Sequence, residues 1–304
     1  MSIVIVGSIN VDITTRSEKL PRPGETLHGD SYSINLGGKG CNQAVAVSKL
    51  GGDVQLVGRI GKDGFGDIAE TQLKDMGVAT DHVLKDENNG TGIAVIGVDA
   101  NSENCITVVG GANMAVSSSD ITQNKELLEN AKLLMLQLEI PAQTCLAAAK
   151  AVQASGGRVV FDPAPAPVHG LPEGFLRHVD VITPNETETE VLTGFKPTNP
   201  QEAAKAADLL RQMGVPAAVV KLGAHGVYFK DETSEGFVKP YKVDSIDSVA
   251  AGDCFNGGLA YALSQGKNLG DAVRFAAACG ALSTTKRGAA TSAPTLKEVE
   301  ELMG

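Results

Sequence analysis

The segment Ala250–Asp253 holds an aspartate directly after three small residues that leave the backbone open. Phe255 and Leu259 follow at helix-face spacing, which predicts a helix starting here. The first N–H groups of a helix have no acceptor within the helix, and the helix dipole favours an anion there. A carboxylate beside such an anion hole suits phosphoryl transfer to an alcohol, because the carboxylate can take the hydroxyl proton while the N–H groups hold the phosphate charge. The alternative is that Asp253 only caps the helix, with Gly252 providing the turn.

A second candidate is the glycine-rich loop Gly37–Gln43. It is not a nucleotide-binding P-loop, because no Ser or Thr follows Lys39 and the glycine spacing differs. The loop offers bare backbone, one ammonium and the amide of Asn42, a set that can bind sugar hydroxyls, and a helix is predicted from about Asn42 to Lys49. The alternative is a tight strand-to-helix turn with an exposed lysine.

Short apolar runs alternate with amphipathic stretches along the chain, which predicts a mostly parallel sheet covered by helices on both faces, a three-layer α/β/α sandwich. The runs that predict buried strands are Ile3–Val6, Leu133–Leu138, Arg158–Phe161, Val179–Ile182 and Ala217–Leu222. The helical stretches are Pro141–Ser155, Pro200–Met213, Asp271–Thr284 and Leu296–Met303. Asn199 is placed as an N-cap and Gly214 as a C-terminal stop.

Polar or glycine-rich loops follow five of these strands. In open α/β sheets ligands bind beyond the carboxyl ends of the strands, so five such loops on one side predict a site. The residues concerned are Asn10, Asp12, Glu139, Asp162, Asn185, Glu188 and the segment Gly223–Gly226.

Two stretches break the alternation and predict a small β element. Ser31–Leu36 alternates polar and apolar residues, while Gly92–Val98 and Cys105–Val109 flank a polar turn typical of an antiparallel hairpin. Their place near the glycine-rich loop fits a lid over the site, and it fits an edge hairpin without such a role equally well. No linker divides the 304 residues, so we expect one domain, 1–304, with lid strands inserted at about 12–36 and 91–110.

Composition limits the partners. Lysine and arginine total 26 against 36 acidic residues, a formal net charge of −10, which argues against nucleic acid or an anionic membrane surface as the main partner. The five scattered cysteines contain no CxxC pair, which fits a reducing cytoplasm rather than a disulfide framework or a zinc site. The N-terminus lacks the features of a signal peptide, and no apolar run approaches the roughly 20 residues that span a bilayer. We therefore expect a cytoplasmic protein.

Nine motifs occur in the order found in one known superfamily. They are the segments 7–12, 23–26, 37–44, 58–64, 110–113, 162–166, 184–188, 222–226 and 247–257. On these motifs the chain, from about residue 3 to 295, resembles the ribokinase, adenosine kinase and fructokinase superfamily, and within it the ribokinase branch.

The resemblance implies a role for each candidate residue. Asp253 corresponds to the catalytic base, and the amides of Ala250, Ala251 and Gly252 form the anion hole. The residues that correspond to sugar contacts are Asn10, Asp12, Gly38, Lys39, Asn42 and Glu139. The residues on the side of ATP are Asn185, Glu188, Lys221, Gly223, Gly226, Gly252 and Asn256, with Glu188 contacting Mg²⁺ through water. The residues that correspond to a monovalent-cation (K⁺) site are Asp247, Val249, Ser283, Lys286, Gly288 and Ser292.

The resemblance implies an ATP- and Mg²⁺-dependent kinase that phosphorylates the primary hydroxyl of D-ribose, with a homodimer formed through the β lid. A kinase for deoxyribose, fructose or adenosine, and a sugar- or nucleotide-binding regulator without catalysis, are the alternatives. A dehydrogenase is disfavoured because the G-x-G-x-x-G fingerprint is absent after the first strand. The chain departs from the family at Cys41, Asp162, Lys221 and Cys254, which leaves the sugar preference open. Cys254 is expected either as a reactive thiolate at a helix N-terminus or as a small buried residue.

Overall fold

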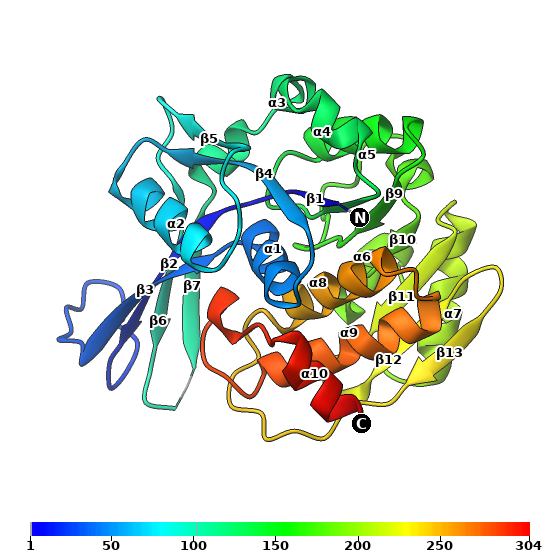
Figure 1. The fold of residues 1–304 in the computed structure, drawn as a ribbon. Helices are drawn as coiled ribbons and strands as arrows, with labels where there is room; N and C mark the ends of the chain where they lie inside the picture. The colour runs from blue at the N-terminus through cyan, green and yellow to red at the C-terminus, as the bar shows by residue number, and fades with distance from the viewer. Residues whose placement is uncertain (1, 102) are drawn as a thin grey trace.

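The computed structural model describes residues 2–101 and 103–304. Within these residues nine strands form the central sheet, in the order β13-β12-β11-β10-β9-β8-β1-β4-β5 (Figure 1). The strands, in chain order, are β1 Ile3–Val6, β4 Val54–Gly61, β5 Val83–Asp86, β8 Leu133–Leu136, β9 Arg158–Phe161, β10 Val181–Ile182, β11 Ala217–Lys221, β12 Val227–Lys230 and β13 Glu235–Val238. Only the β11–β12 and β12–β13 pairings are antiparallel, so the predicted mostly parallel sheet is confirmed.

Helices cover both faces of this sheet, as expected for a three-layer sandwich. The helices on one face are α1 Lys39–Lys49, α2 Gly64–Asp75, α8 Ala251–Ser264, α9 Leu269–Ser283 and α10 Leu296–Met303. Those on the other face are α3 Ser118–Gln123, α4 Lys125–Glu129, α5 Ala142–Ala154, α6 Glu186–Thr193 and α7 Pro200–Gln212. In the described part of the chain there are also four 3₁₀ turns: η1 Gly111–Ala115, η2 Phe175–His178, η3 Gly223–His225 and η4 Ala290–Ser292.

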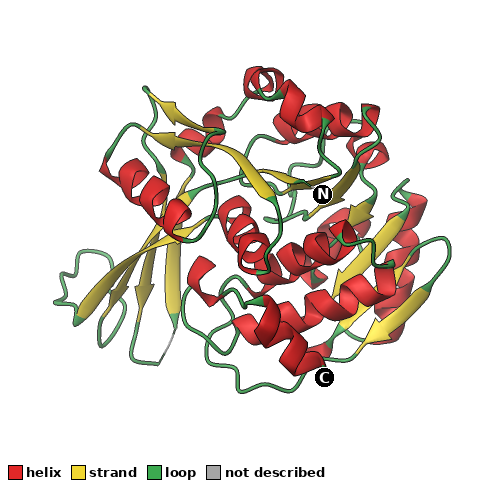
Figure 2. Ribbon diagram, in the orientation of Figure 1, coloured by secondary structure: helices red, strands yellow, loops and turns green. Residues whose placement is uncertain are grey.

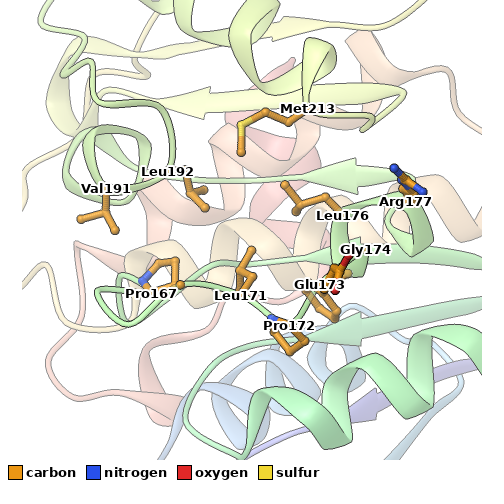
Figure 3. A pocket seen from close by; sticks show the side chains of 12 residues that line it. Pro167, Leu171, Pro172, Glu173, Gly174, Leu176, Arg177, Val191, Leu192 and Met213 are labelled. Atoms are coloured by element: carbon orange, nitrogen blue, oxygen red, sulfur yellow. The ribbon is translucent and has the colours of Figure 1, made fainter.

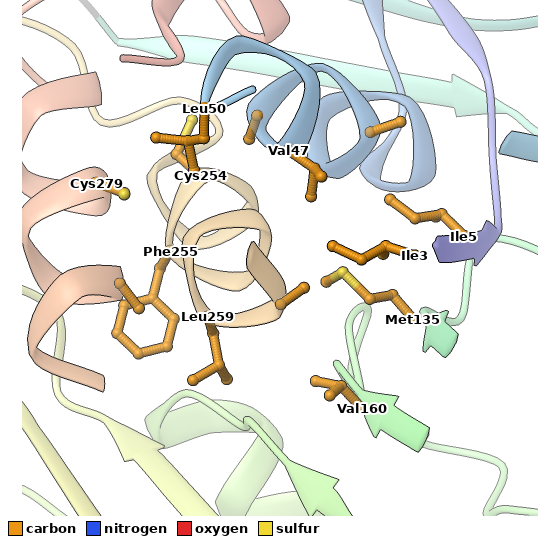
Figure 4. Close-up of a cluster of buried hydrophobic side chains, with 14 of the residues drawn as sticks. Ile3, Ile5, Val47, Leu50, Met135, Val160, Cys254, Phe255, Leu259 and Cys279 are labelled. Atoms are coloured by element: carbon orange, nitrogen blue, oxygen red, sulfur yellow. The ribbon is translucent and has the colours of Figure 1, made fainter. Parts of the chain in front are cut away.

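The two helical layers give two hydrophobic cores, because successive side chains of a strand point to opposite faces. Ile3 and Ile5 of β1 belong to one core, and Val4 and Val6 belong to the other. In the first core α8 lies between α1 and α9, with Leu259 directed toward the sheet (Figure 4). The helix that carries Asp253 is therefore held from three sides.

A smaller four-stranded sheet, in the order β3-β2-β6-β7, projects from the main body (Figures 1 and 2). Its strands are β2 Asn10–Arg16, β3 Ser31–Gly37, β6 Gly92–Val98 and β7 Asn104–Val109. The predicted hairpin is confirmed, since β6 and β7 pair antiparallel. This sheet, called the lid below, exposes apolar side chains, because Tyr32 is 74% and Ile106 53% accessible.

Most predicted elements are confirmed to within two residues at each end. Asn199 caps α7, since its side chain accepts from the Glu202 N–H, and Gly214 follows the helix with φ 101°. The prediction that the glycine-loop helix begins near Asn42 was wrong, because α1 begins at Lys39. Gly38 permits the early start: its φ is 89°, and a Cβ there would lie 2.8 Å from the Asn10 nitrogen.

Among the helices of the described residues, none is long and apolar enough to cross a membrane. All five cysteines are free thiols.

Candidate active site

A cleft of about 620 Å³ lies beyond the carboxyl ends of the parallel strands, where the polar loops were predicted to meet. It brings together residues from distant parts of the chain, and the predicted residues that line it are Lys39, Asp162, Asn185, Glu188, Lys221, Gly223, Gly226, Ala250, Ala251, Gly252 and Asp253. Apolar side chains, among them those of Tyr241 and Phe255, also line it.

Asp253 lies in the first turn of α8 but does not cap it. The N-cap is Ala250, in the left-handed conformation with φ 57°, and no side chain bonds the cap. The alternative of Asp253 as an N-cap is therefore wrong. Its carboxylate is 5% exposed and accepts two hydrogen bonds from α1, from Asn42 Nδ2 at 2.9 Å and from Gln43 Nε2 at 3.3 Å.

Burial raises the pKa of Asp253, the charge of Lys39 opposes that rise, and the charge of Asp162 adds to it. A carboxylate with a raised pKa is a stronger base than an exposed one, so this environment suits acceptance of a hydroxyl proton. The ammonium of Lys39 lies among acidic groups, and attraction to Asp253 is the main cause that raises its pKa. Lys39 is thus a fixed positive charge in the wall of the cleft.

The predicted anion hole keeps two of its three amides available. The Ala251 N–H donates to the Ser248 carbonyl at 3.2 Å, so it has an acceptor already. Within the described residues no acceptor is recorded for the N–H of Ala250, Gly252 or Asp253. The open N-terminus of α8 therefore offers N–H groups beside the carboxylate, and their role toward a phosphate stays a prediction.

The residues predicted to bind the sugar lie between β2, the start of α1 and the loop after β8. Glu139 accepts from the Ser8 hydroxyl at 2.6 Å and from the Lys39 N–H at 3.0 Å, which fixes it at the glycine loop. Asn113 Nδ2 donates to Asn10 Oδ1 at 2.7 Å. The buried Oδ1 of Asn42 has no partner among the described residues, so it is an acceptor ready for a hydroxyl.

Asp12 stands next to this group, and burial, followed by the charges of Glu139 and Asp253, raises its pKa to about 6. Its carboxylate lies against Gly37, where a Cβ would come within 2.3 Å of both oxygens. Gly37 is thus required to be a glycine if Asp12 is to keep this orientation.

On the nucleotide side, Asn185 and Glu188 form a capping box at the start of α6. Lys221 Nζ lies 3.2 Å from Asp162 Oδ1, and a Cβ on Gly252 would lie 3.8 Å from the same ammonium. Lys221 therefore stands beside the open end of α8. Burial raises the pKa of Glu188, while the charge of Lys221 opposes the rise.

Asn256 lies outside the cleft, and its role on the side of ATP stays a prediction. It is fully buried, and neither atom of its amide has a partner among the described residues. Cys254 is also buried, and burial raises the pKa of its thiol to about 12, so it is a small neutral residue rather than a thiolate.

The residues predicted to bind a monovalent cation surround two loops beside α8. Asp247 joins them, because its carboxylate accepts from the Val249 N–H at 3.0 Å and from the Gly288 N–H at 3.1 Å. The hydroxyl of Ser283 donates to the Gly280 carbonyl within α9, and that of Ser292 donates to the Ala289 carbonyl. The side chain of Lys286 instead pairs with Glu298 of α10, at 2.6 Å.

Two buried side-chain amides near Asp253, those of Gln43 and Gln137, had no predicted role. Gln43 bonds both Asp253 and Asp162, and Gln137 Nε2 donates to Gln43 Oε1 at 2.6 Å. Gln43 belongs to the recognised glycine-loop motif, which is the signal that could have indicated it. Gln137 stands within the apolar run 133–138, and its only signal was a polar residue inside a run predicted as a buried strand.

A second hollow of about 440 Å³ lies between the loop 167–177 and α6, with Leu171, Leu176, Leu192 and Met213 in its wall (Figure 3). None of the predicted site residues lines it.

Comparison with known proteins places the chain. The model of the pfkB family of carbohydrate kinases matches residues 1–296. The chain is 38% identical to a ribokinase of Haemophilus influenzae over 302 residues, 99% of this chain and 98% of that protein. It is 34% identical to a deoxyribokinase of Salmonella typhi over 303 residues, 100% of this chain and 99% of that protein. The solved structure of Arabidopsis thaliana ribokinase complexed with ribose and ATP is similar with a TM-score of 0.93 and 34% identity, covering 99% of this chain and 98% of that one.

These relatives confirm the resemblance to the ribokinase branch, and with it the sandwich fold and the class of phosphotransferases. The chain belongs to the pfkB family of carbohydrate kinases.

Proposed function

We propose that this protein transfers the γ-phosphoryl group of ATP to the primary hydroxyl of D-ribose, giving ribose 5-phosphate. The observation that carries the proposal is the buried carboxylate of Asp253, held by two amides of α1 at the open N-terminus of α8. The similarity to a Haemophilus influenzae ribokinase, and to an Arabidopsis thaliana ribokinase complexed with ribose and ATP, supports ribose and ATP as the substrates.

In the proposed mechanism the sugar lies against β2 and the glycine loop, held by Asp12, Asn42 and Glu139. Asp253 takes the proton of the primary hydroxyl as the oxygen attacks the γ-phosphorus, and ADP leaves in line. Lys39, Lys221 and the open N–H groups of α8 hold the charge on the phosphoryl group.

Mg²⁺ fits this site as a companion of ATP rather than as a resident ion. Among residues 2–101 and 103–304, no group of three or more His, Cys, Asp or Glu is arranged to hold a metal by itself. Mg²⁺ commonly uses one or two carboxylates together with substrate phosphates, and Glu188 in the cleft wall can supply such a contact through water. Bound in this way, the ion neutralises charge on the phosphates.

A monovalent cation fits the loops that Asp247 joins. The oxygen atoms that could ligate it are those of the Asp247 carboxylate and of backbone carbonyls. Two carbonyls of this region, those of Thr291 and Ala293, already accept hydrogen bonds from a cation, the ammonium of Lys49, at 2.9 Å and 3.2 Å. In our proposal K⁺ binds at these loops and orders the N-terminus of α8, without contact to the sugar.

The lid supports a homodimer. All residues of β7 are exposed, and the side chains of Ile106, Val108 and Val109 are each more than half accessible. Apolar strands at a sheet edge are commonly covered by a partner, and a second copy of the lid is the proposed partner. The five free thiols fit the proposed location in a reducing cytoplasm.

A kinase for deoxyribose is the second candidate, because the Salmonella typhi deoxyribokinase matches the chain along its whole length. A coupled assay of ADP release with ribose, deoxyribose, fructose and adenosine tests both candidates and the alternative of a non-catalytic regulator. We expect the highest kcat/KM with ribose, and ³¹P–¹H correlation should place the phosphate on its C5 oxygen. ADP release with none of the four substrates would contradict the proposed function.

A further inference from the structure

We propose that Gln43 is a positioning residue, which sets the orientation of the Asp253 carboxylate and joins it to the Asp162–Lys221 pair on the nucleotide side. The inference rests on the proposed function and deepens it, because it concerns how the base of the same site is held.

The contacts of Gln43 define this role. Its Nε2 lies 3.3 Å from Asp253 Oδ1 and 3.2 Å from Asp162 Oδ2, and Lys221 Nζ lies 3.2 Å from the other oxygen of Asp162. Gln43 is fully buried, Asp253 is 5% exposed and Asp162 is 2% exposed. One side-chain amide therefore stands between the proposed base and the carboxylate that pairs with the nucleotide-side lysine.

A glutamine suits this position because its NH₂ group has two hydrogens, one for each carboxylate, and no charge. Two buried carboxylates repel each other, and a donor between them reduces the repulsion without removing the negative charge that the base needs. The third contact fixes the amide, because Gln43 Oε1 accepts from Gln137 Nε2 at 2.6 Å. A reversed amide would place its oxygen against both carboxylates.

Gln137 in turn depends on Gly7 at the end of β1. A Cβ on Gly7 would lie 2.2 Å from Gln137 Oε1 and 2.8 Å from the Cα of Gly40. Gly7, which fits no dinucleotide fingerprint, thus leaves the space in which Gln137 supports Gln43.

Several charged or titratable groups face Asp253 besides these amides. They are Lys39 and Cys41 of α1, Asp12 of β2, Glu139 and Asp162 from the loops after β8 and β9, and Cys254 of α8 itself. All but Lys39 are negative when ionised and favour a protonated Asp253. Gln43 and Asn42 donate to the ionised form, so removal of Gln43 should raise the pKa of Asp253.

The test is Gln43→Met, which keeps the length of the side chain and removes both donors. The pKa of Asp253 is measured in the ligand-free protein from the ¹³Cγ shift of labelled aspartate, with the resonance assigned by its loss in Asp253→Asn. We expect this pKa to rise, the acid limb of the kcat/KM profile, which reports the free enzyme, to move to higher pH by the same amount, and kcat at neutral pH to fall about ten- to a hundredfold. KM for ATP should change less than threefold, with part of kcat recovered at high pH.

Gln153→Met is the matched control, because Gln153 lies on α5 and bonds the Arg177 carbonyl and His178, outside the cleft. It should leave the pKa of Asp253 and the acid limb unchanged. Gln137→Met should shift the pKa of Asp253 and the acid limb in the same direction as Gln43→Met, but by less. If Gln43→Met does not fold, Gln137→Met tests the inference in its place.

An unchanged pKa of Asp253 in the folded variants would overturn the inference, and so would a lower kcat with an unmoved acid limb, which marks a purely structural role. The failure of the proposed function looks different: the wild-type protein would then phosphorylate no sugar, while the pKa comparison, made without sugar, still decides the role of Gln43.

Discussion

The side-chain amide of Asn42 donates to Oδ2 of Asp253 at 2.9 Å, so a residue predicted to bind sugar also holds the proposed base. Its other amide atom, Oδ1, is buried without a partner and is the atom left for a sugar hydroxyl. A single side chain thus bonds the base and is free to bond the substrate.

Asn42→Ala should therefore affect binding and turnover together. The loss of one hydrogen bond to the sugar costs about 0.5–1.5 kcal/mol, which raises KM for ribose up to about tenfold. Loss of the bond to Asp253 lowers kcat as well, whereas KM for ATP should change little. Steady-state kinetics with each substrate varied in turn measures the three effects, and an equal rise of both KM values would show that Asn42 acts only on the fold.

Asp253→Asn should abolish most of the turnover while the protein stays folded. Asparagine keeps the size of the side chain but cannot take a proton, and general-base catalysis contributes about 10²–10⁴-fold. Binding of ribose and ATP, measured by calorimetry, should be largely kept, since the lost interaction belongs to the transition state. Thermal unfolding of the variant provides the control. A folded variant with more than about a tenth of the normal kcat would refute the role of Asp253 as the base.

Asp12 should make sugar binding dependent on pH near 6. Its folded pKa is about 6, so the carboxylate that accepts sugar hydroxyls is protonated below that pH and KM for ribose should rise. The ordinary value is 3.8, so the folded protein binds a proton between pH 3.8 and about 6 that the unfolded chain has released. Stability therefore falls as the pH rises through this window.

Asp12→Asn removes the loss of folding stability that ionisation of Asp12 causes, because asparagine is neutral at every pH. Its Tm should exceed that of the wild type at pH 8, and the difference should shrink as the pH falls from about 6 toward 3.8. The gain in stability comes with weaker ribose binding. A Tm difference that does not depend on pH would show that ionisation of Asp12 is not its source.

Lys221 should serve both ATP binding and stability. Lys221→Met leaves Asp162 buried without its cation, and removal of one partner of a buried ion pair typically costs about 3–5 kcal/mol. The double variant Lys221→Met/Asp162→Asn should recover much of the free energy of unfolding in urea. It should not recover KM for ATP, which we expect to rise about tenfold from the loss of a phosphate contact. Recovery of both quantities would assign Lys221 a structural role alone.

Potassium should activate the enzyme through the loops joined by Asp247. Activity is compared in potassium chloride and in tetramethylammonium chloride at equal ionic strength, and the higher kcat is expected in potassium. Asp247→Asn should reduce this difference, because it removes the charged ligand. Equal activity in the two salts would refute the site.

The sequence predicted the elements better than the contacts between them. Ile3–Val6 and Arg158–Phe161 have the bounds expected from their apolar runs, since strands covered on both faces are apolar throughout. The start of α1 was placed three residues late, because the early start depends on Gly38 against the Asn10 backbone, a contact between separate segments. No local pattern could show it.

The same limit explains the missed amides. Gln43 and Gln137 are 94 positions apart and meet only when the fold brings α1 to the end of β8. The segment around Asp253, in contrast, could suggest a base beside an anion hole, with an N-cap as the alternative, because the open backbone, the carboxylate and the helix after it are neighbours in the sequence. Chemistry concentrated in one segment can be predicted from that segment, and chemistry shared between segments needs the fold.

Four of the five thiols, at 41, 145, 254 and 279, are buried, and Cys105 on the lid strand β7 is exposed. A maleimide fluorophore should therefore react at Cys105 first and mark the lid without any engineered cysteine. Its emission and anisotropy would then follow lid closure on addition of ribose, and contact with a second lid on dilution, in the wild-type protein.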